Sequence, residues 1–116
     1  MNIKRIVANL QSDVPKQSIV FYVDFLGMEA VMERDEIITF AAHDNPIAQL
    51  SVLLEEESNV PYPNISVEVS DVDEAHAKAV ALGISIVYPL TNEPWGVRRF
   101  FVIDPNGMIV NILSHL

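Results

Sequence analysis

Apolar and polar positions follow the same order in each half of this chain. The first half predicts a strand at residues 3–10, an apolar helix at 17–26, and strands at 28–33, 37–42 and 48–54. The second half predicts a strand at residues 64–69, a helix ending near 82, and strands at 84–89, 98–103 and 109–113. Both helices end in a Leu-Gly pair, at Leu26-Gly27 and Leu82-Gly83, where glycine can end the helix in a left-handed conformation. This repetition predicts a duplicated unit whose copies pack together to bury a core.

The stretch that opens the second half carries the clearest local signals. Its apolar residues alternate with Asn64, Ser66 and Glu68, which predicts a strand with one apolar and one polar face. Asp71 follows as a candidate helix N-cap, and Glu74 lies three residues later, as in a capping box. A helix therefore begins directly after this strand.

The order of elements predicts an α+β fold. Two paired βαβββ modules would form a curved mixed sheet around a groove, with the helices on the outer face of the sheet. Module 1 is expected at about 1–58 and module 2 at about 59–116, joined by a charged, proline-containing connector at 55–63. We interpret residues 1–116 as a single domain, and we expect function in the groove.

Composition narrows the classes of function. Of the 116 residues, 50% are hydrophobic and 20% are charged, which is typical of a compact globular chain. The absence of cysteine excludes disulfides, thiolate metal sites and a thiol nucleophile. No apolar run approaches the roughly 18–20 residues that would span a bilayer, and the N-terminus does not resemble a signal peptide, so no membrane partner and a cytoplasmic location are expected. A net charge of −9 argues against nucleic acid as a partner, and it is compatible either with a cationic ligand or simply with solubility.

Three segments resemble a known family. They are SIVFYVDFLG at 18–27, NISVEVSDVD at 64–73 and PWGVRRFFVIDPNG at 94–107. Together they are similar to the glyoxalase/bleomycin-resistance/extradiol-dioxygenase superfamily, also called the vicinal oxygen chelate fold, over essentially the whole chain. The resemblance implies the paired βαβββ fold. It does not select a function, because this fold hosts isomerases, dioxygenases, thiol transferases and non-catalytic binders.

The resemblance also shows where metal ligands would stand. Enzymes of the family hold a divalent metal with His, Glu or Gln side chains on the groove-facing strands. The glutamate expected on the last strand is replaced by Asn111, and the histidine expected at the start of the second half is replaced by Asn64. The histidine position of the first strand falls near Ile6. Asparagine offers neither a carboxylate charge nor an imidazole nitrogen. The sequence therefore predicts no metal ligands, no cofactor and no catalytic residue.

A few other side chains could replace the missing metal ligands. Gln49 and Glu68 are the best remaining oxygen donors, although polar lining of the groove is the favoured interpretation of this pair. The three histidines, His43, His76 and His115, are interpreted as ordinary surface or boundary residues.

Several side chains suit ligand binding instead. Trp95, the single tryptophan, could stack on a planar or cationic group, or it could cap the sheet edge or anchor an interface. Arg98 could meet an anion, but an ion pair with a local acid is favoured, and alternation puts Arg99 on the other face. The candidate ligand-binding residues are Gln49, Asn64, Ser66, Glu68, Trp95, Arg98 and Asn111.

The first helix bears on assembly. It is apolar on most sides, which predicts deep burial and allows a dimer contact. The resemblance implies homodimers, and it implies a metal-free bleomycin-resistance branch that sequesters a cationic drug. We therefore favour a metal-free, homodimeric protein that binds a small organic ligand, with antibiotic resistance by drug sequestration as its most concrete form. The alternatives are a metal-dependent lyase, isomerase or dioxygenase with displaced ligands, and a non-catalytic interaction module.

Overall fold

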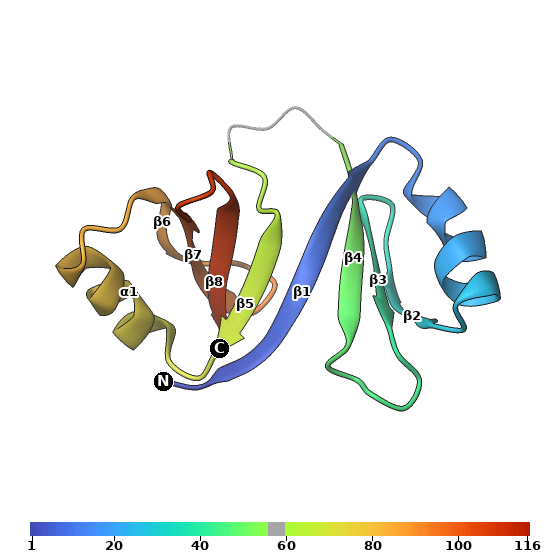
Figure 1. Cartoon of the computed structure of the whole chain (residues 1–116), viewed down its shortest axis with the longest axis horizontal. Helices are drawn as coiled ribbons and strands as arrows, with labels where there is room; N and C mark the ends of the chain where they lie inside the picture. The colour runs from blue at the N-terminus through green and yellow to red at the C-terminus, as the bar shows by residue number, and fades with distance from the viewer. Residues whose placement is uncertain (56–59) are drawn as a thin grey trace. The chain divides into compact units, whose positions relative to one another are not determined.

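A computed structural model describes residues 1–55 and 60–116 (Figure 1). The described elements are β1 (Ile3–Ser12), η1 (Pro15–Gln17), η2 (Val20–Phe25), β2 (Glu29–Glu33), β3 (Ile37–Ala41), β4 (Gln49–Leu54), β5 (Ile65–Val69), α1 (Val72–Ala81), β6 (Ile86–Asn92), β7 (Val97–Ile103) and β8 (Ile109–His115). Each half of the chain has the order strand, helix, three strands, which confirms the predicted α+β fold with βαβββ modules. Within the described residues, no helix is long and apolar enough to cross a membrane.

Two compact units divide the chain. The first-half unit contains residues 7–55, and the second-half unit contains residues 1–6 and 60–116. Strand β1 therefore contributes its first residues to the second-half unit and the remainder to the first-half unit. The predicted boundary at 58/59 and much of the predicted connector fall on residues 56–59, outside the described residues.

The first-half unit has the strand order β2-β3-β4-β1. Strands β1 and β4 are parallel, whereas β4, β3 and β2 pair antiparallel. Its core is formed by Ile38, Phe40 and Val52, and Tyr22 and Val23 of η2 pack against these three residues. This is the mixed pairing that a βαβββ module requires, because the crossover helix returns the chain to a parallel neighbour.

The helix of the first-half unit differs from the prediction. A 3₁₀ turn with Pro15 in its first turn is followed by a π-helix, and Gly27 ends it at a φ of 76°. None of the six residues of η2 is buried, and Val20 and Phe25 are 65% and 71% exposed. The expected deep burial is therefore wrong for a single chain. Only one side of the helix packs on Phe40 and its neighbours, so the apolar residues on the other side remain exposed.

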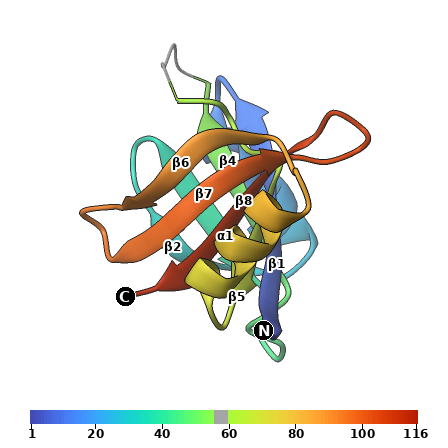
Figure 2. The same ribbon diagram turned by 90° about the vertical axis from the view of Figure 1, so that its left-hand side faces the viewer.

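The second-half unit has the strand order β1-β5-β8-β7-β6, with β5 and β8 parallel. Helix α1 lies across one face of these strands (Figure 2), where its Val72, Ala75 and Ala79 pack with Phe100. The predicted N-cap is confirmed, because the Asp71 carboxylate accepts a hydrogen bond from the Glu74 backbone N–H at 3.0 Å.

The last strand is longer than the sequence predicted. Strand β7 begins at Val97, and Val97 pairs with His115, so β8 continues two residues beyond residue 113. Strand β6 instead begins late, because the Ile84 N–H bonds to the Ala79 carbonyl and continues the end of α1. The longer β8 adds His115 to the residues that the sheet holds in place.

Side chains alternate between the two faces of this sheet. Val67, Phe100 and Ile112 pack in the core beneath α1, so the residues between them point to the opposite face. We call that opposite side the distal face. Its residues on β5, β7 and β8 are Ser66, Glu68, Arg99, Phe101, Asn111, Leu113 and His115.

Candidate functional site

Six of the seven candidate residues belong to the second-half unit. The exception is Gln49, which lies on β4 of the first-half unit and donates a hydrogen bond to the Pro46 carbonyl at 2.7 Å. Within the second-half unit, Ser66, Glu68 and Asn111 share the distal face, whereas Asn64, Trp95 and Arg98 lie at its margin or on the other side.

The two asparagines at the family's metal-ligand positions have other contacts. The backbone N–H of Asn64 donates to the Ile109 carbonyl at 2.8 Å, and its side-chain oxygen accepts from the Ile109 N–H at 3.0 Å. Asn111 is 7% exposed and donates from its side-chain nitrogen to the Ser66 hydroxyl at 3.1 Å. Its side-chain oxygen is buried and has no hydrogen-bond partner among the described residues. Both asparagines therefore couple β5 to β8.

Glu68 is the centre of a charged cluster on the distal face. One carboxylate oxygen lies 3.0 Å from the Arg5 Nε, the other lies 2.7 Å from the His115 Nδ1, and the side chain is only 12% exposed. Burial acts to raise the pKa of this carboxyl, but the hydrogen bond from His115 and the charge of Arg5 outweigh burial and hold the pKa below its ordinary value. Glu68 is consequently ionised at neutral pH and can only accept hydrogen bonds.

His115 has a defined environment that the sequence interpretation missed. Its backbone is held in the sheet opposite Val97, and the next residue, Leu116, donates its N–H to the Gly96 carbonyl at 2.9 Å. The imidazole is half exposed, and its Nδ1 faces the Glu68 carboxylate. The signal that could have revealed it was the alternation of distal residues along β8, which continues past Leu113 to His115.

Arg99 forms a second cluster on the distal face. Its guanidinium carbon lies 5.0 Å from the centre of the Trp95 ring, and the rings of Tyr88 and Phe101 lie at 5.3 and 4.8 Å. The guanidinium also pairs with Glu93 at 2.8 Å, and Glu93 accepts the Tyr88 hydroxyl at 2.9 Å. One side of the Trp95 indole is therefore occupied by a cation from the same chain, while the residue as a whole remains 56% exposed.

Arg98 lies on the side of the sheet that carries α1. Its Nε and one terminal nitrogen each lie 3.1 Å from the Asp73 carboxylate, and the other terminal nitrogen donates to the Asn92 side chain at 2.8 Å. The ion pair with a local acid, favoured from the sequence, is present and ties β7 to the start of α1. Arg98 is therefore separated from the Glu68 and Arg99 clusters.

The side chains present do not fit the divalent metal of the family's enzymes. Across residues 1–55 and 60–116, no three His, Cys, Asp or Glu side chains gather closely enough to hold a metal ion. Both carboxylate oxygens of Glu68 face positively charged or donor groups, and the Asn64 oxygen is bonded to backbone. Hard cations need several oxygen ligands that are not already engaged.

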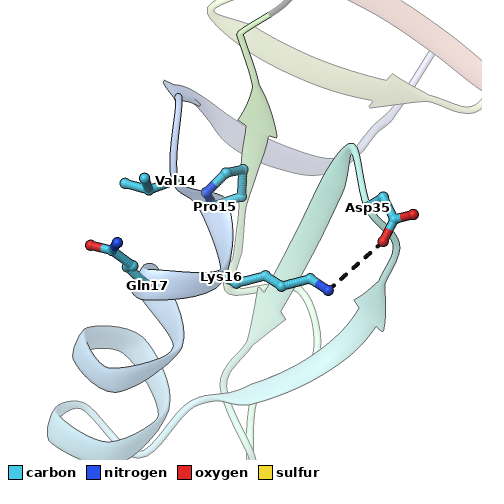
Figure 3. A pocket seen from close by; sticks show the side chains of 5 residues that line it. All are labelled: Val14, Pro15, Lys16, Gln17 and Asp35. Atoms are coloured by element: carbon cyan, nitrogen blue, oxygen red, sulfur yellow. Dashed lines mark ion pairs between the residues drawn. The ribbon is translucent and has the colours of Figure 1, made fainter.

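Cavities occur away from these clusters. An apolar pocket of about 400 Å³ lies between α1 and the sheet, with Val69, Ala79 and Phe100 among its lining residues. A second depression, of about 290 Å³, lies beside Pro15 in the first-half unit, and there the Lys16 amine is 3.8 Å from the Asp35 carboxylate (Figure 3). The first pocket suits an apolar group, and neither pocket brings together groups for chemistry.

Comparison with known proteins adds the family context. The model of the "Glyoxalase/Bleomycin resistance protein/Dioxygenase superfamily" matches residues 3–112. Among solved structures, a member of that superfamily from Vibrio splendidus 12B01 has 20% identity and a TM-score of 0.75, over 97% of this chain and 99% of that one. Methylmalonyl-CoA epimerase from Mycobacterium tuberculosis has 19% identity and a TM-score of 0.76, over 98% and 87% of the two chains.

A larger enzyme shares the fold as well. An extradiol ring-cleaving dioxygenase from B. fuscum has 21% identity and a TM-score of 0.71, over 98% of this chain and 33% of that one. No curated protein sequence matches the chain significantly. At these identities the solved structures show a common fold.

Proposed function

The chain belongs to the glyoxalase/bleomycin resistance protein/dioxygenase superfamily, and from this premise we propose that it binds a small organic molecule without a metal ion. The proposal is supported by what the residues at the family's metal-ligand positions contact. Asn64 and Asn111 hold β5 to β8, and the nearby Glu68 is committed to Arg5 and His115. Because these side chains already hold the strands together or neutralise neighbouring charges, ligand binding is favoured over metal-dependent chemistry.

The distal face and its margin suggest the chemistry of the ligand. The exposed indole of Trp95 offers a flat surface for a planar group, and Arg99 already fills one side of it. The protein carries a net charge of −9, which favours a cationic ligand through its long-range field. Sequestration of a cationic, drug-like molecule by a homodimer is the form of the proposal that fits these features best, with a role in antibiotic resistance and a cytoplasmic location.

A binding assay with bleomycin, a cationic glycopeptide drug, tests this function. Because Trp95 is the only tryptophan, its fluorescence reports directly on occupancy of the indole. We expect bleomycin to quench this fluorescence and to raise the melting temperature, since a ligand at one hundred times its Kd stabilises the folded state by about 2.7 kcal/mol. Trp95→Ala should lose the thermal shift. Val80→Ala, at an exposed apolar position of α1 that lines neither pocket, should keep the thermal shift.

A metal assay separates the proposal from its main alternative. The protein would be incubated with Mn²⁺, Fe²⁺, Ni²⁺ or Zn²⁺, desalted and subjected to elemental analysis. We expect no stoichiometric retention of metal. Tightly held metal at one equivalent would contradict the proposal and favour a metal-dependent lyase, isomerase or dioxygenase with displaced ligands. If the protein retains no metal and bleomycin changes neither the melting temperature nor the fluorescence, a non-catalytic interaction module becomes the favoured interpretation.

A further inference from the structure

The histidine on the distal face supports more than binding. We propose that His115 transfers protons to and from a small planar molecule that lies against Trp95, with Glu68 as its positioning residue. The proposal deepens the proposed function and rests on it for the location of the ligand. It does not depend on that ligand being a drug.

The hydrogen-bond chemistry of the cluster fixes the role of each imidazole nitrogen. The Glu68 carboxylate lies 2.7 Å from the His115 Nδ1 and 3.0 Å from the Arg5 Nε. The charge of Arg5 and the hydrogen bond from His115 keep the pKa of Glu68 low despite its burial, so this carboxylate accepts and does not donate. The proton of the neutral imidazole therefore resides on Nδ1, and Nε2 carries the lone pair that can act as a base.

The topology brings Trp95 to the same end of the sheet. His115 pairs with Val97 at the start of β7, and the Leu116 N–H bonds to the carbonyl of Gly96, the residue after Trp95. The indole lies over Arg99, which points to the same distal face as His115. Trp95 is 56% exposed and the His115 side chain is 55% exposed, so both residues present surface to solvent at this end of the sheet.

This arrangement defines a class of substrate and a balanced step. The substrate is a small planar molecule with an acidic C–H bond and an electronegative atom that can accept charge. The Nε2 lone pair takes the proton, and the C–H electron pair forms a new π bond in the substrate. The displaced pair of electrons ends on the electronegative atom. The imidazolium is stabilised by the ionised Glu68 and later returns its proton to solvent or to product.

The chain contains its own matched control. His43 also places its Nδ1 against a carboxylate, that of Glu29, at 2.6 Å. This second pair lies in the first-half unit, and its carboxylate is 55% exposed, compared with 12% for Glu68. Both pairs therefore contain a histidine–carboxylate contact, but only His115 has a buried carboxylate partner and lies at the end of the sheet that carries Trp95.

Ring opening of nitrobenzisoxazole tests the proposal without knowledge of a natural substrate. A base removes the C–H proton, the C–H pair forms the nitrile, the N–O bond breaks, and a coloured cyanonitrophenolate is released. We expect the protein to accelerate this reaction by about 10²-fold or more over free imidazole at the same concentration, as for positioned general bases. His115→Gln should remove the acceleration, and His43→Gln should leave it unchanged.

The kinetic constants separate a positioning role of Glu68 from a merely structural one. In Glu68→Gln the imidazole loses the carboxylate that orients it, so we expect kcat to fall while KM stays close to that of the unmodified protein, and Glu68→Asp should recover part of the loss. Trp95→Ala should raise KM and leave kcat nearly unchanged. An unchanged kcat in Glu68→Gln would overturn the role of Glu68, and an unchanged rate in His115→Gln would overturn the proposal.

Nitrogen NMR of the unmodified protein provides a test that needs no variant to fold. We expect the neutral His115 ring to carry its proton on Nδ1, and a proton on Nε2 would overturn the proposal.

Failure of this proposal can be distinguished from failure of the proposed function. A flat bleomycin screen with an active His115 would reject the drug ligand and keep the proton transfer. Binding of bleomycin without turnover of nitrobenzisoxazole would keep the drug ligand and reject the proton transfer.

Discussion

Glu68 connects three strands of the second-half unit through one carboxylate. Arg5 lies on β1, Glu68 on β5 and His115 on β8, and the carboxylate is the shared partner of both basic groups. Burial would raise its pKa, yet the hydrogen bond and the positive charge around it lower the pKa instead. The ionisation of the Glu68 side chain therefore affects how firmly these three strands are held together.

This linkage predicts how stability depends on pH. A carboxyl whose folded pKa is depressed contributes stability above its unfolded pKa, here 4.5, and this contribution is lost as the pH falls through the folded pKa. We expect Glu68→Gln to lower the free energy of unfolding by about 1–3 kcal/mol at pH 7, because the Arg5 ion pair and the His115 hydrogen bond both lose their charged partner. The difference from the unmodified protein should shrink below pH 4.5. Urea unfolding at several pH values measures both, and a difference independent of pH would contradict the prediction.

The arginine pair shows what residue-level reasoning could and could not supply. Alternation along β7 correctly separated Arg98 from Arg99 onto opposite faces. The sequence did not reveal that Trp95 joins Arg99, because the course of the 93–96 loop depends on tertiary contacts such as the Arg99–Glu93 ion pair. Periodicity assigns a residue to a face, while loops decide which residues meet there.

Element boundaries followed local chemistry where that chemistry was strong. The N-cap of α1 at Asp71 and its end near Gly83 were readable because capping and positive φ act within a few residues. The π-helical winding of η2 was not readable, since its apolar residues match ordinary helical spacing. The end of β8 was misjudged because strand length depends on the partner strand β7.

The N-cap of α1 provides a prediction at the scale of the element. Asp71→Ala removes the acceptor for the Glu74 N–H, and we expect it to lower the free energy of unfolding by about 1 kcal/mol. Asp71→Asn keeps a capping oxygen and serves as the matched control, with a much smaller loss expected. Chemical denaturation at neutral pH measures both variants. Equal losses would show that charge near the helix terminus, and not the hydrogen bond, stabilises α1.

At the scale of the whole molecule, the exposed apolar surface of η2 is the feature that packing within one chain does not account for. Phe21, Phe25 and Leu26 are 52%, 71% and 53% exposed, and the rings of Phe21 and Phe25 lie 5.3 Å apart. A contiguous apolar surface of this kind is typical of a protein interface. It supports the proposed homodimer, with η2 in the contact between copies.

Substitution of this surface tests the assembly. We expect the unmodified chain to be a dimer in sedimentation velocity at micromolar concentration, and Phe21→Ser/Phe25→Ser to shift it to monomer. Leu82→Ser removes another exposed apolar side chain, 74% exposed at the end of α1, and should leave the dimer intact. Because Phe21 and Phe25 are already more than half exposed within the chain, the double variant should retain its circular dichroism spectrum. A dimer that survives the double substitution would place the contact elsewhere, and loss of the dimer in Leu82→Ser alone would move it to the second-half unit.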